Sequence, residues 1–298
     1  MSNDFAARIS GFAAKASVEI TSGDRELPAQ LAGRLPAGTA LYIAHTPNTT
    51  LAEVAEVACI VQRAGFAACP HVVARRIASR AELEPALRRL ADGGVKRALL
   101  VAGDQSPPAG AFSSTLDIIE SGALEAAGIA SIGVAGHPEG NPNIDAAQHI
   151  AALRRKQAYG ERTGVAVHVV TQFGFEPAAL VAFDRALTAN GIRLPVHAGV
   201  AGPASLKSLA KFASMCGIGA SIGALLTNPG ALGALKSLVK TVDELFPAIV
   251  RLREGDLATR VVQPHFFAFG GVMKTVEWIE SVRAGRFDLE ADRITVRN

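Results

Sequence analysis

The sequence of 298 residues has little cysteine, few aromatic residues and a small net charge, and each shortage excludes a class of protein. Its three cysteines, Cys59, Cys69 and Cys216, are widely spaced and form no Cys-x-x-Cys pair. This spacing argues against a disulfide framework and against a structural zinc site. The formal charge is only +3, and the basic residues are scattered among acidic ones, so we expect no nucleic-acid partner. The densest basic run, Arg154-Arg155-Lys156, is typical of a solvated helix face.

The chain also lacks a long apolar run and a secretion signal. Apolar residues make up 49% of the sequence, but they are distributed as alanine, valine and leucine. The longest candidate for a membrane span, around Cys216–Leu226, is short and interrupted by glycines. The first five residues, Met1–Phe5, do not have the charged-then-apolar layout of a signal peptide. We therefore expect a cytoplasmic protein with no membrane partner.

Several motifs of enzyme chemistry are missing. No Gly-x-Gly-x-x-Gly follows the first expected strand, and no phosphate-binding P-loop is present. There is no Gly-x-Ser-x-Gly elbow, which disfavours nucleophilic hydrolysis. The seven histidines form no His-x-x-x-His or His-x-His group, so no metal site is expected.

What the sequence does contain is a regular alternation of strand and helix patterns. Eight strands are expected at Ala16–Thr21, Ala40–His45, Ala67–Val73, Arg97–Ala102, Ala130–Ala135, Ala166–Phe173, Pro195–Val200 and Val261–Phe269. The strands are nearly continuous apolar runs, as expected for a parallel sheet covered on both faces. Eight such units favour a (β/α)8 TIM barrel, a single catalytic domain over residues 1–298, and the alternative is a doubly wound open sheet.

Helical patterns fill the intervals between the strands. Apolar residues recur at helical spacing from Leu51 to Val61 and from Leu83 to Leu90, and Ser79 with Glu82 predicts a capping box. Further helices are expected at Glu176–Asn190, Ser205–Cys216 and Val272–Ala284, with an extra helical segment within Gly219–Leu245. The tail Phe287–Asn298 has strand-like residues without an assigned place.

Two strand endings are the clearest sign of a ligand site. The strand patterns before the loop His137–Pro142 and before Gln172-Phe173 both stop abruptly at polar, glycine-rich or aromatic residues. The loops after parallel strands gather at one face, where ligands bind. Gln172 offers a donor and an acceptor that match a heterocyclic amide edge. Phe173 or Phe175 could stack on a flat ring, although a core position is the more common role for phenylalanine.

Two carboxylates at strand ends are suited to acid catalysis. Glu19 lies between Val18 and Ile20 in the first strand, and burial of such a carboxylate raises its pKa and favours general-acid work. A structural pair with Arg or Lys is an equally good interpretation of Glu19. Asp104 ends the fourth strand, and the next helix pattern starts near Ser113, too far away for a simple helix cap. The residues thus indicate an enzyme that binds a flat, polar heterocycle.

Taken together, these motifs resemble those of the methylenetetrahydrofolate reductases. The resemblance is carried, in the same order along the chain, by Ser17-Val18-Glu19, Pro70-His71, Ala102-Gly103-Asp104 with Pro107-Pro108, Ala135–Pro142, Thr171-Gln172-Phe173, Lys211-Phe212 with Cys216-Gly217, and His265-Phe266-Phe267. It extends from about residue 15 to residue 284, nearly the whole chain.

The resemblance implies a (β/α)8 barrel that interconverts 5,10-methylenetetrahydrofolate and 5-methyltetrahydrofolate with NADH or NADPH and FAD. By position, it implies that Glu19 is the general acid, that Asp104 holds the pterin and stabilises positive charge, and that Gln172 and Phe212 bind the folate. It also implies that His71, Ala135, His137, Asn141, His149 and Lys156 contact the cofactor. The implied partners are tetrahydrofolate derivatives, and a homo-oligomer remains open.

The departures from the family pattern fall on the cofactor side. Ala102 stands where the family usually has Arg, and His137 stands where Tyr is common. Asn141 replaces a common His, and His149 falls near the position of an Asp that typically binds the cofactor. Two routes for the hydride therefore remain open: through FAD, or directly from the nicotinamide. The alternative function is a folate-binding or methyltransferase-type one-carbon protein on the same barrel without redox chemistry. The sequence does not determine the direction of the reaction.

Overall fold

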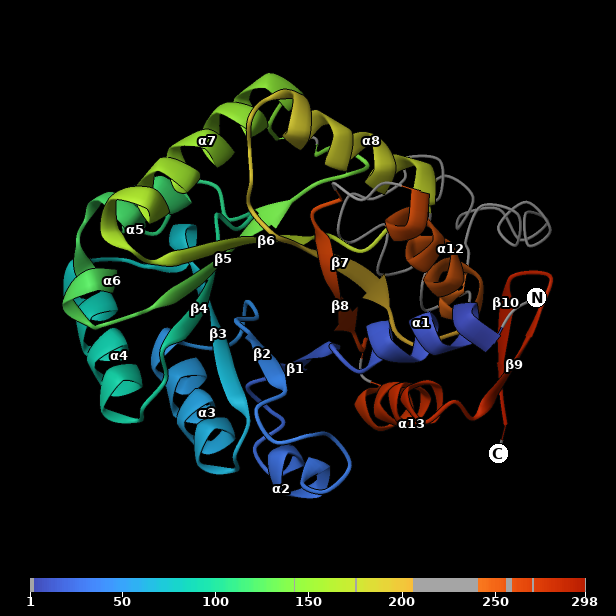
Figure 1. Cartoon of the computed structure of the whole chain (residues 1–298). Coiled ribbons are helices and arrows are strands. Elements are labelled where there is room, and N and C mark those ends of the chain that lie inside the picture. Colours follow the sequence, from blue (N-terminus) through green and yellow to red (C-terminus); the bar gives the residue numbers. More distant parts are fainter. Residues whose placement is uncertain are drawn as a thin grey trace, which may run out of the picture. The chain divides into compact units, whose positions relative to one another are not determined.

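The computed structural model describes residues 3–141, 143–174, 176–205, 241–255, 259–269 and 271–297 (Figure 1). Eight parallel strands form a closed barrel in the order of the sequence, β1 to β8, which confirms the predicted (β/α)8 fold. The strands are β1 Ser17–Thr21, β2 Ala40–Ala44, β3 Ala67–Val73, β4 Arg97–Val101, β5 Ser131–Gly136, β6 Ala166–Thr171, β7 Val196–Ala201 and β8 Val261–Phe267. All eight begin and end close to the predicted positions.

The helices of the described residues are α1 Asn3–Ala13, α2 Leu27–Leu31, α3 Leu51–Arg63, the 3-10 helix η1 Ala74–Arg76, α4 Arg80–Asp92, α5 Thr115–Glu120, α6 Ala123–Ala126, α7 Ala146–Thr163, α8 Pro177–Ala189, α12 Val242–Gly255 and α13 Val272–Arg283. Helices α3, α4, α8 and α13 lie where the periodicity predicts them, whereas α1, α2, α5, α6 and α7 were not predicted. The tail that the sequence left unassigned forms an antiparallel hairpin of β9 Phe287–Glu290 and β10 Arg293–Val296. The expected helix Ser205–Cys216 and the extra segment Gly219–Leu245 lie largely outside the described residues, apart from Ser205 and the start of α12. None of the described helices is long and apolar enough to cross a membrane.

Local sequence explains where the helices start. In α3, the Thr50 side chain accepts from the Glu53 N–H (3.2 Å), and the Glu53 carboxylate accepts from the Thr50 N–H (2.7 Å), which completes a capping box. The capping box predicted for α4 is not formed. Ser79 is the N-cap residue, but the Glu82 carboxylate accepts from the Ala78 N–H instead (2.8 Å), one residue further back.

By its internal contacts, the chain divides into two compact units. Unit 1 comprises residues 1–16, 136–151 and 171–298, and unit 2 comprises residues 17–135 and 152–170. In unit 2, α3 packs against β3 and against α4 (Figure 1). The side chains buried within unit 2 include a cluster of Tyr42, Cys69, Leu99 and Val170.

Unit 1 has an aromatic core. Phe246 stacks on Phe266 with ring centroids 6.0 Å apart and meets Trp278 edge-on at 5.1 Å. The Trp278 indole N–H donates to the Asp243 carboxylate over 2.7 Å, which satisfies the polar end of this largely buried ring. This core joins α12, β8 and α13 within the unit.

Candidate functional site

In unit 2, Glu19 pairs with His71. Glu19 lies in β1 between the fully buried Val18 and Ile20, and its carboxylate oxygen is 3.4 Å from Nε2 of His71 in β3. The two side chains are only 22% and 12% exposed. The sequence suggested an Arg or Lys partner as one option, whereas the structure supplies an imidazole. Unlike Arg, an imidazole can exchange a proton with a carboxyl group near neutral pH.

A layer of neutral polar groups lies next to this pair. The Tyr42 hydroxyl is 3.0 Å from Nε2 of His168, and the Tyr42 ring meets the His71 ring edge-on with centroids 6.3 Å apart. Burial raises the pKa of Tyr42 well above its usual value, and burial raises the pKa of Cys69 to about 12. The phenol and the thiol therefore stay protonated at neutral pH.

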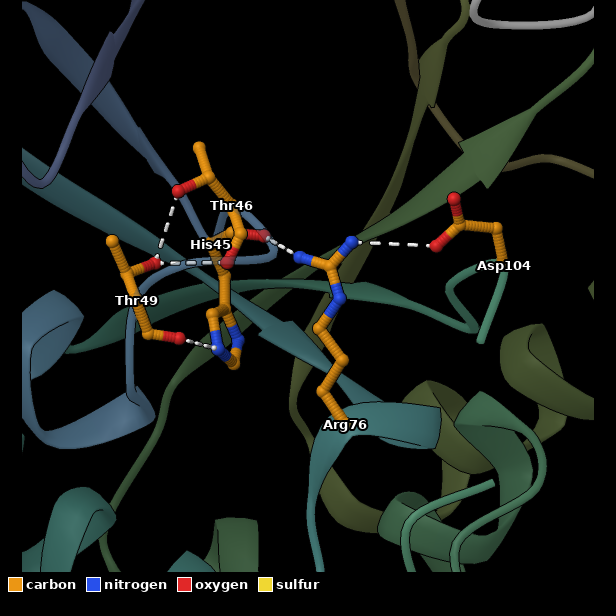
Figure 2. A network of polar contacts seen from close by, with 5 residues as sticks. All are labelled: His45, Thr46, Thr49, Arg76 and Asp104. Carbon is orange, nitrogen blue, oxygen red and sulfur yellow. Dashed lines mark hydrogen bonds and ion pairs between the residues drawn. The ribbon is translucent and has the colours of Figure 1, made fainter. Parts of the chain in front are cut away.

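Asp104 is the exposed end of a polar network (Figure 2). Its carboxylate, 85% exposed, accepts from the Arg76 guanidinium over 3.3 Å, and the same guanidinium donates to the backbone carbonyl of His45. The helix-cap alternative does not hold for Asp104, because the next helix, α5, has Ser114 as its N-cap residue. Asp104 thus follows β4 as an accessible anion in contact with one largely buried cation.

The His45 ring belongs to the same network. Its Nε2 is 3.0 Å from the Thr49 carbonyl, and since a carbonyl only accepts, Nε2 carries the proton. Burial lowers the pKa of His45, and the Arg76 cation lowers it further. His45 is therefore neutral at neutral pH, and Arg76 is the cation of the network.

In unit 1, Gln172 lines a pocket. The Gln172 N–H donates to the Gly136 carbonyl over 2.8 Å, which fixes the backbone just after β6. The pocket has an open volume of about 430 Å³, and its wall combines the polar His137, Glu139 and Gln172 with the apolar Leu180, Leu245 and Ile249. A wall of mixed polar and apolar side chains suits a flat heterocycle with a hydrogen-bonding edge.

Close packing in β7 shapes this pocket. A Cβ atom at Gly199 would lie 2.3 Å from the Thr171 carbonyl oxygen and 2.8 Å from that of Gln172. Real Cβ contacts are never this short, so the approach of β7 to the end of β6 requires glycine here.

His137, in the loop after β5, and His149, in α7, lie side by side in unit 1. The buried His149 ring lies 5.2 Å from the His137 ring and stacks on Phe183 at 5.8 Å with planes 18° apart. The Asn141 side-chain amide is 3.4 Å from Nε2 of His137. His137 lines the pocket, and His149 and Asn141 contact the His137 side chain.

Lys156 departs from the sequence expectation. A solvated helix face was predicted for the run Arg154–Lys156, but Lys156 is only 6% exposed. Burial lowers the pKa of its amine to about 8, and within the described ranges the amine makes no hydrogen bond or ion pair. The prediction was wrong for Lys156 because the helix α7 turns this position toward the protein interior. A buried, unpaired amine fits an anionic group, such as the phosphate of a dinucleotide.

Two predicted residues are buried, and others cannot be placed. Phe173 is buried against Phe267 and Phe269 and also lines the pocket beside Gln172. His265 is completely buried, the core position that is more common for a lone strand histidine. Phe212 and Phe175 lie outside the described residues. Within the described ranges, no group of three or more His, Cys, Asp or Glu side chains could hold a metal ion.

Sequence reasoning missed three polar residues near the strand ends. Arg76 and His45 follow β3 and β2, and Glu139 lines the pocket and accepts from the Glu176 N–H over 3.1 Å. The position of Arg76 could have indicated a site residue, since it comes only a few residues after the third strand. Nothing in its local sequence indicates that its partner is Asp104.

The fold and these groups define a (β/α)8 barrel with one carboxyl group inside a strand, Glu19 in β1, and with an anion and an amide in the segments after two other strands, Asp104 and Gln172. The sequence matches the methylenetetrahydrofolate reductase family over residues 36–229, more than half of the chain, and the chain belongs to that family. This membership makes it a folate-related one-carbon oxidoreductase. The matched range includes Asp104, Gln172 and Phe212, and Glu19 precedes it.

Proposed function

We propose that the protein interconverts 5,10-methylenetetrahydrofolate and 5-methyltetrahydrofolate, with NADH or NADPH as the hydride donor and FAD as the carrier. The observation that carries this proposal is the Glu19–His71 pair in a chain of this family. A half-buried carboxyl group 3.4 Å from an imidazole is equipped to hold and release a proton.

Glu19 is the general acid in this proposal. Reduction of the methylene group requires the five-membered ring that bridges two folate nitrogens to open, and opening requires a proton on the departing nitrogen. Glu19 delivers that proton, and His71 contacts the carboxylate that remains. In the reverse direction Glu19 takes the proton back, because the same groups serve both directions.

Asp104 and Gln172 bind and stabilise the substrate. Ring opening leaves a cationic iminium, and a fixed carboxylate near this cation lowers the barrier because it is already oriented before charge develops. Gln172 matches the amide edge of the pterin with one donor and one acceptor. Phe212 packs on the aminobenzoyl part.

The cofactor-binding residues are those that the family resemblance implies. His71, Ala135, His137, Asn141, His149 and Lys156 hold FAD in this proposal, and the buried amine of Lys156 supports an anion at that point. Ala102 provides no side-chain charge, so Lys156 carries more of the phosphate binding. When bound, FAD supplies a two-electron carrier between the nicotinamide and the folate.

The test starts with the absorbance spectrum of the purified protein and with NADH or NADPH oxidation in the presence and absence of methylenetetrahydrofolate. We expect a flavin band and folate-dependent oxidation. Glu19→Gln keeps the shape of the side chain and removes the acid, so we expect a loss of about 100-fold or more in kcat. Glu84→Gln, on the exposed surface of α4, is the matched control and should keep the parent rate.

Two results would contradict parts of the proposed function. Parent-like turnover by Glu19→Gln would show that another group supplies the proton. Tight methyltetrahydrofolate binding without nicotinamide oxidation, or methyl transfer to a thiol or corrinoid, would favour the one-carbon protein without redox chemistry.

A further inference from the structure

Arg76 connects two strand ends of unit 2. It lies at the end of η1, directly after β3, and its guanidinium contacts the His45 carbonyl after β2 and the Asp104 carboxylate after β4 (Figure 2). The Arg76 side chain is 16% exposed and the Asp104 side chain is 85% exposed. A largely buried cation therefore holds a largely exposed anion.

At each end of this connection, Arg76 contacts one specific acceptor. The His45 carbonyl is part of a turn in which His45 Nε2 bonds to the Thr49 carbonyl and the hydroxyls of Thr46 and Thr49 lie 3.2 Å apart. At the other end, Oδ1 of Asp104 accepts from Arg76, and within the described residues Oδ2 has no hydrogen-bond partner. One carboxylate oxygen is fixed, and the other is available to a ligand.

An exposed aspartate without such a contact would sample several side-chain rotamers. The planar guanidinium contacts both acceptors at once through its two terminal nitrogens, which a lysine amine on a flexible stem cannot do with the same geometry. A carboxylate that is oriented before the reaction stabilises developing positive charge better than a mobile one.

We propose that Arg76 is a positioning residue that orients the Asp104 carboxylate toward the substrate cation. The inference rests on the proposed function, because it needs a cation at Asp104. Since the pair is mostly solvated at Asp104, it contributes little to stability. Substitution of Arg76 should therefore affect turnover much more than melting.

A double-mutant cycle tests this role. The variants are Arg76→Met, Asp104→Asn and the double variant, and each is measured for kcat and KM in the folate-dependent reaction and for thermal melting. We expect Arg76→Met to lower kcat about 10-fold, the cost of one charge-assisted hydrogen bond, and Asp104→Asn to lower it at least as much. If Arg76 acts through Asp104, the double variant has the kcat of Asp104→Asn alone.

The control is Arg80→Met, which removes an exposed Arg–Glu84 pair on α4 and should leave kcat unchanged. If Arg76→Met melts below the assay temperature, Arg76→Lys replaces it in the cycle. The criterion is the same: the double variant should have the kcat of Asp104→Asn alone. Losses in kcat that multiply in the double variant would overturn the proposal, because Arg76 would then act independently of Asp104.

Calorimetric titration of the parent protein with 5-methyltetrahydrofolate distinguishes a failure of the proposed function from a failure of the positioning role of Arg76. A parent protein that neither binds nor turns over folate contradicts the proposed function, and the positioning role with it. A parent protein that does both, with independent losses in the variants, contradicts the positioning role alone.

Discussion

At the scale of single residues, Lys156 is the most unusual group outside the acid pair. An amine is costly to bury, and here no carboxylate within the described residues offsets the cost. Proteins keep such groups where a ligand or a reaction uses them, at the expense of stability. The buried amine of Lys156 should therefore lower the free energy of unfolding of the ligand-free protein by a measurable amount.

We expect Lys156→Met to stabilise the ligand-free protein. A pKa of about 8 in the folded chain against 10.5 unfolded means that the folded state binds fewer protons between these pH values. The cost is complete below pH 8, where it amounts to about 3 kcal/mol, and it disappears as the pH rises from 8 to 10.5. Urea denaturation at neutral pH and near pH 10 measures the difference.

Lys96→Met, at an exposed position of the same unit, is the control and should change the free energy of unfolding little. A Lys156→Met variant that is less stable than the parent at neutral pH would mean that the amine has a stabilising anionic partner in the ligand-free protein.

At the scale of elements, two helices with similar start sequences differ in their capping. In α3 the Thr50 hydroxyl and the Glu53 carboxylate bond each other's backbone N–H groups, whereas in α4 the Ser79 side chain makes no capping bond. The same local pattern, Ser or Thr followed three residues later by Glu, thus forms a capping box in α3 but not in α4. The reason is that the Glu82 carboxylate can accept from the Ala78 N–H as well as from the Ser79 N–H.

Alanine substitution at the two N-cap positions tests this difference. Thr50→Ala removes a bond to an otherwise unpaired helix N–H, and we expect it to lower the free energy of unfolding by about 1 kcal/mol. Ser79→Ala is the matched variant and should cost much less, because it removes no such bond. Chemical denaturation of both variants gives the comparison, and equal costs would show that Ser79 caps α4 in solution.

At the scale of the whole molecule, the closed barrel explains the composition. A closed sheet leaves no strand edge, and parallel strands with both faces covered need nearly continuous apolar runs. Aromatic residues are few, and several of them form the core of unit 1. Small residues elsewhere allow close approaches such as that of Gly199 to Thr171.

Folate binding should stabilise the whole chain. A ligand that binds the folded but not the unfolded protein adds about 2.7 kcal/mol at a concentration 100 times its Kd. For a chain of this size, we expect 5-methyltetrahydrofolate to raise the melting temperature by several degrees in a thermal scan. Gln172→Ala, which removes the amide from the pocket wall, should reduce this shift. An unchanged shift in Gln172→Ala would remove Gln172 from the folate site.

The sequence by itself determined the order of the eight strands, several of the helices between them and the barrel, and it singled out Glu19, Asp104 and Gln172. It could do so because hydrophobic periodicity and turn residues act over a few neighbouring positions. The roles of these residues in binding and catalysis remain predictions.

Only the tertiary structure decided which groups meet. The pairing of Glu19 with His71, the link from Arg76 to Asp104 and the burial of Lys156 all depend on how neighbouring strands align and on which side of a helix faces inward. These contacts join residues that are far apart in the chain, and local sequence carries no record of a distant partner. The physical reason is that charge and hydrogen-bond partners are set by the packing of the closed barrel, whereas local propensity sets only the strands and helices themselves.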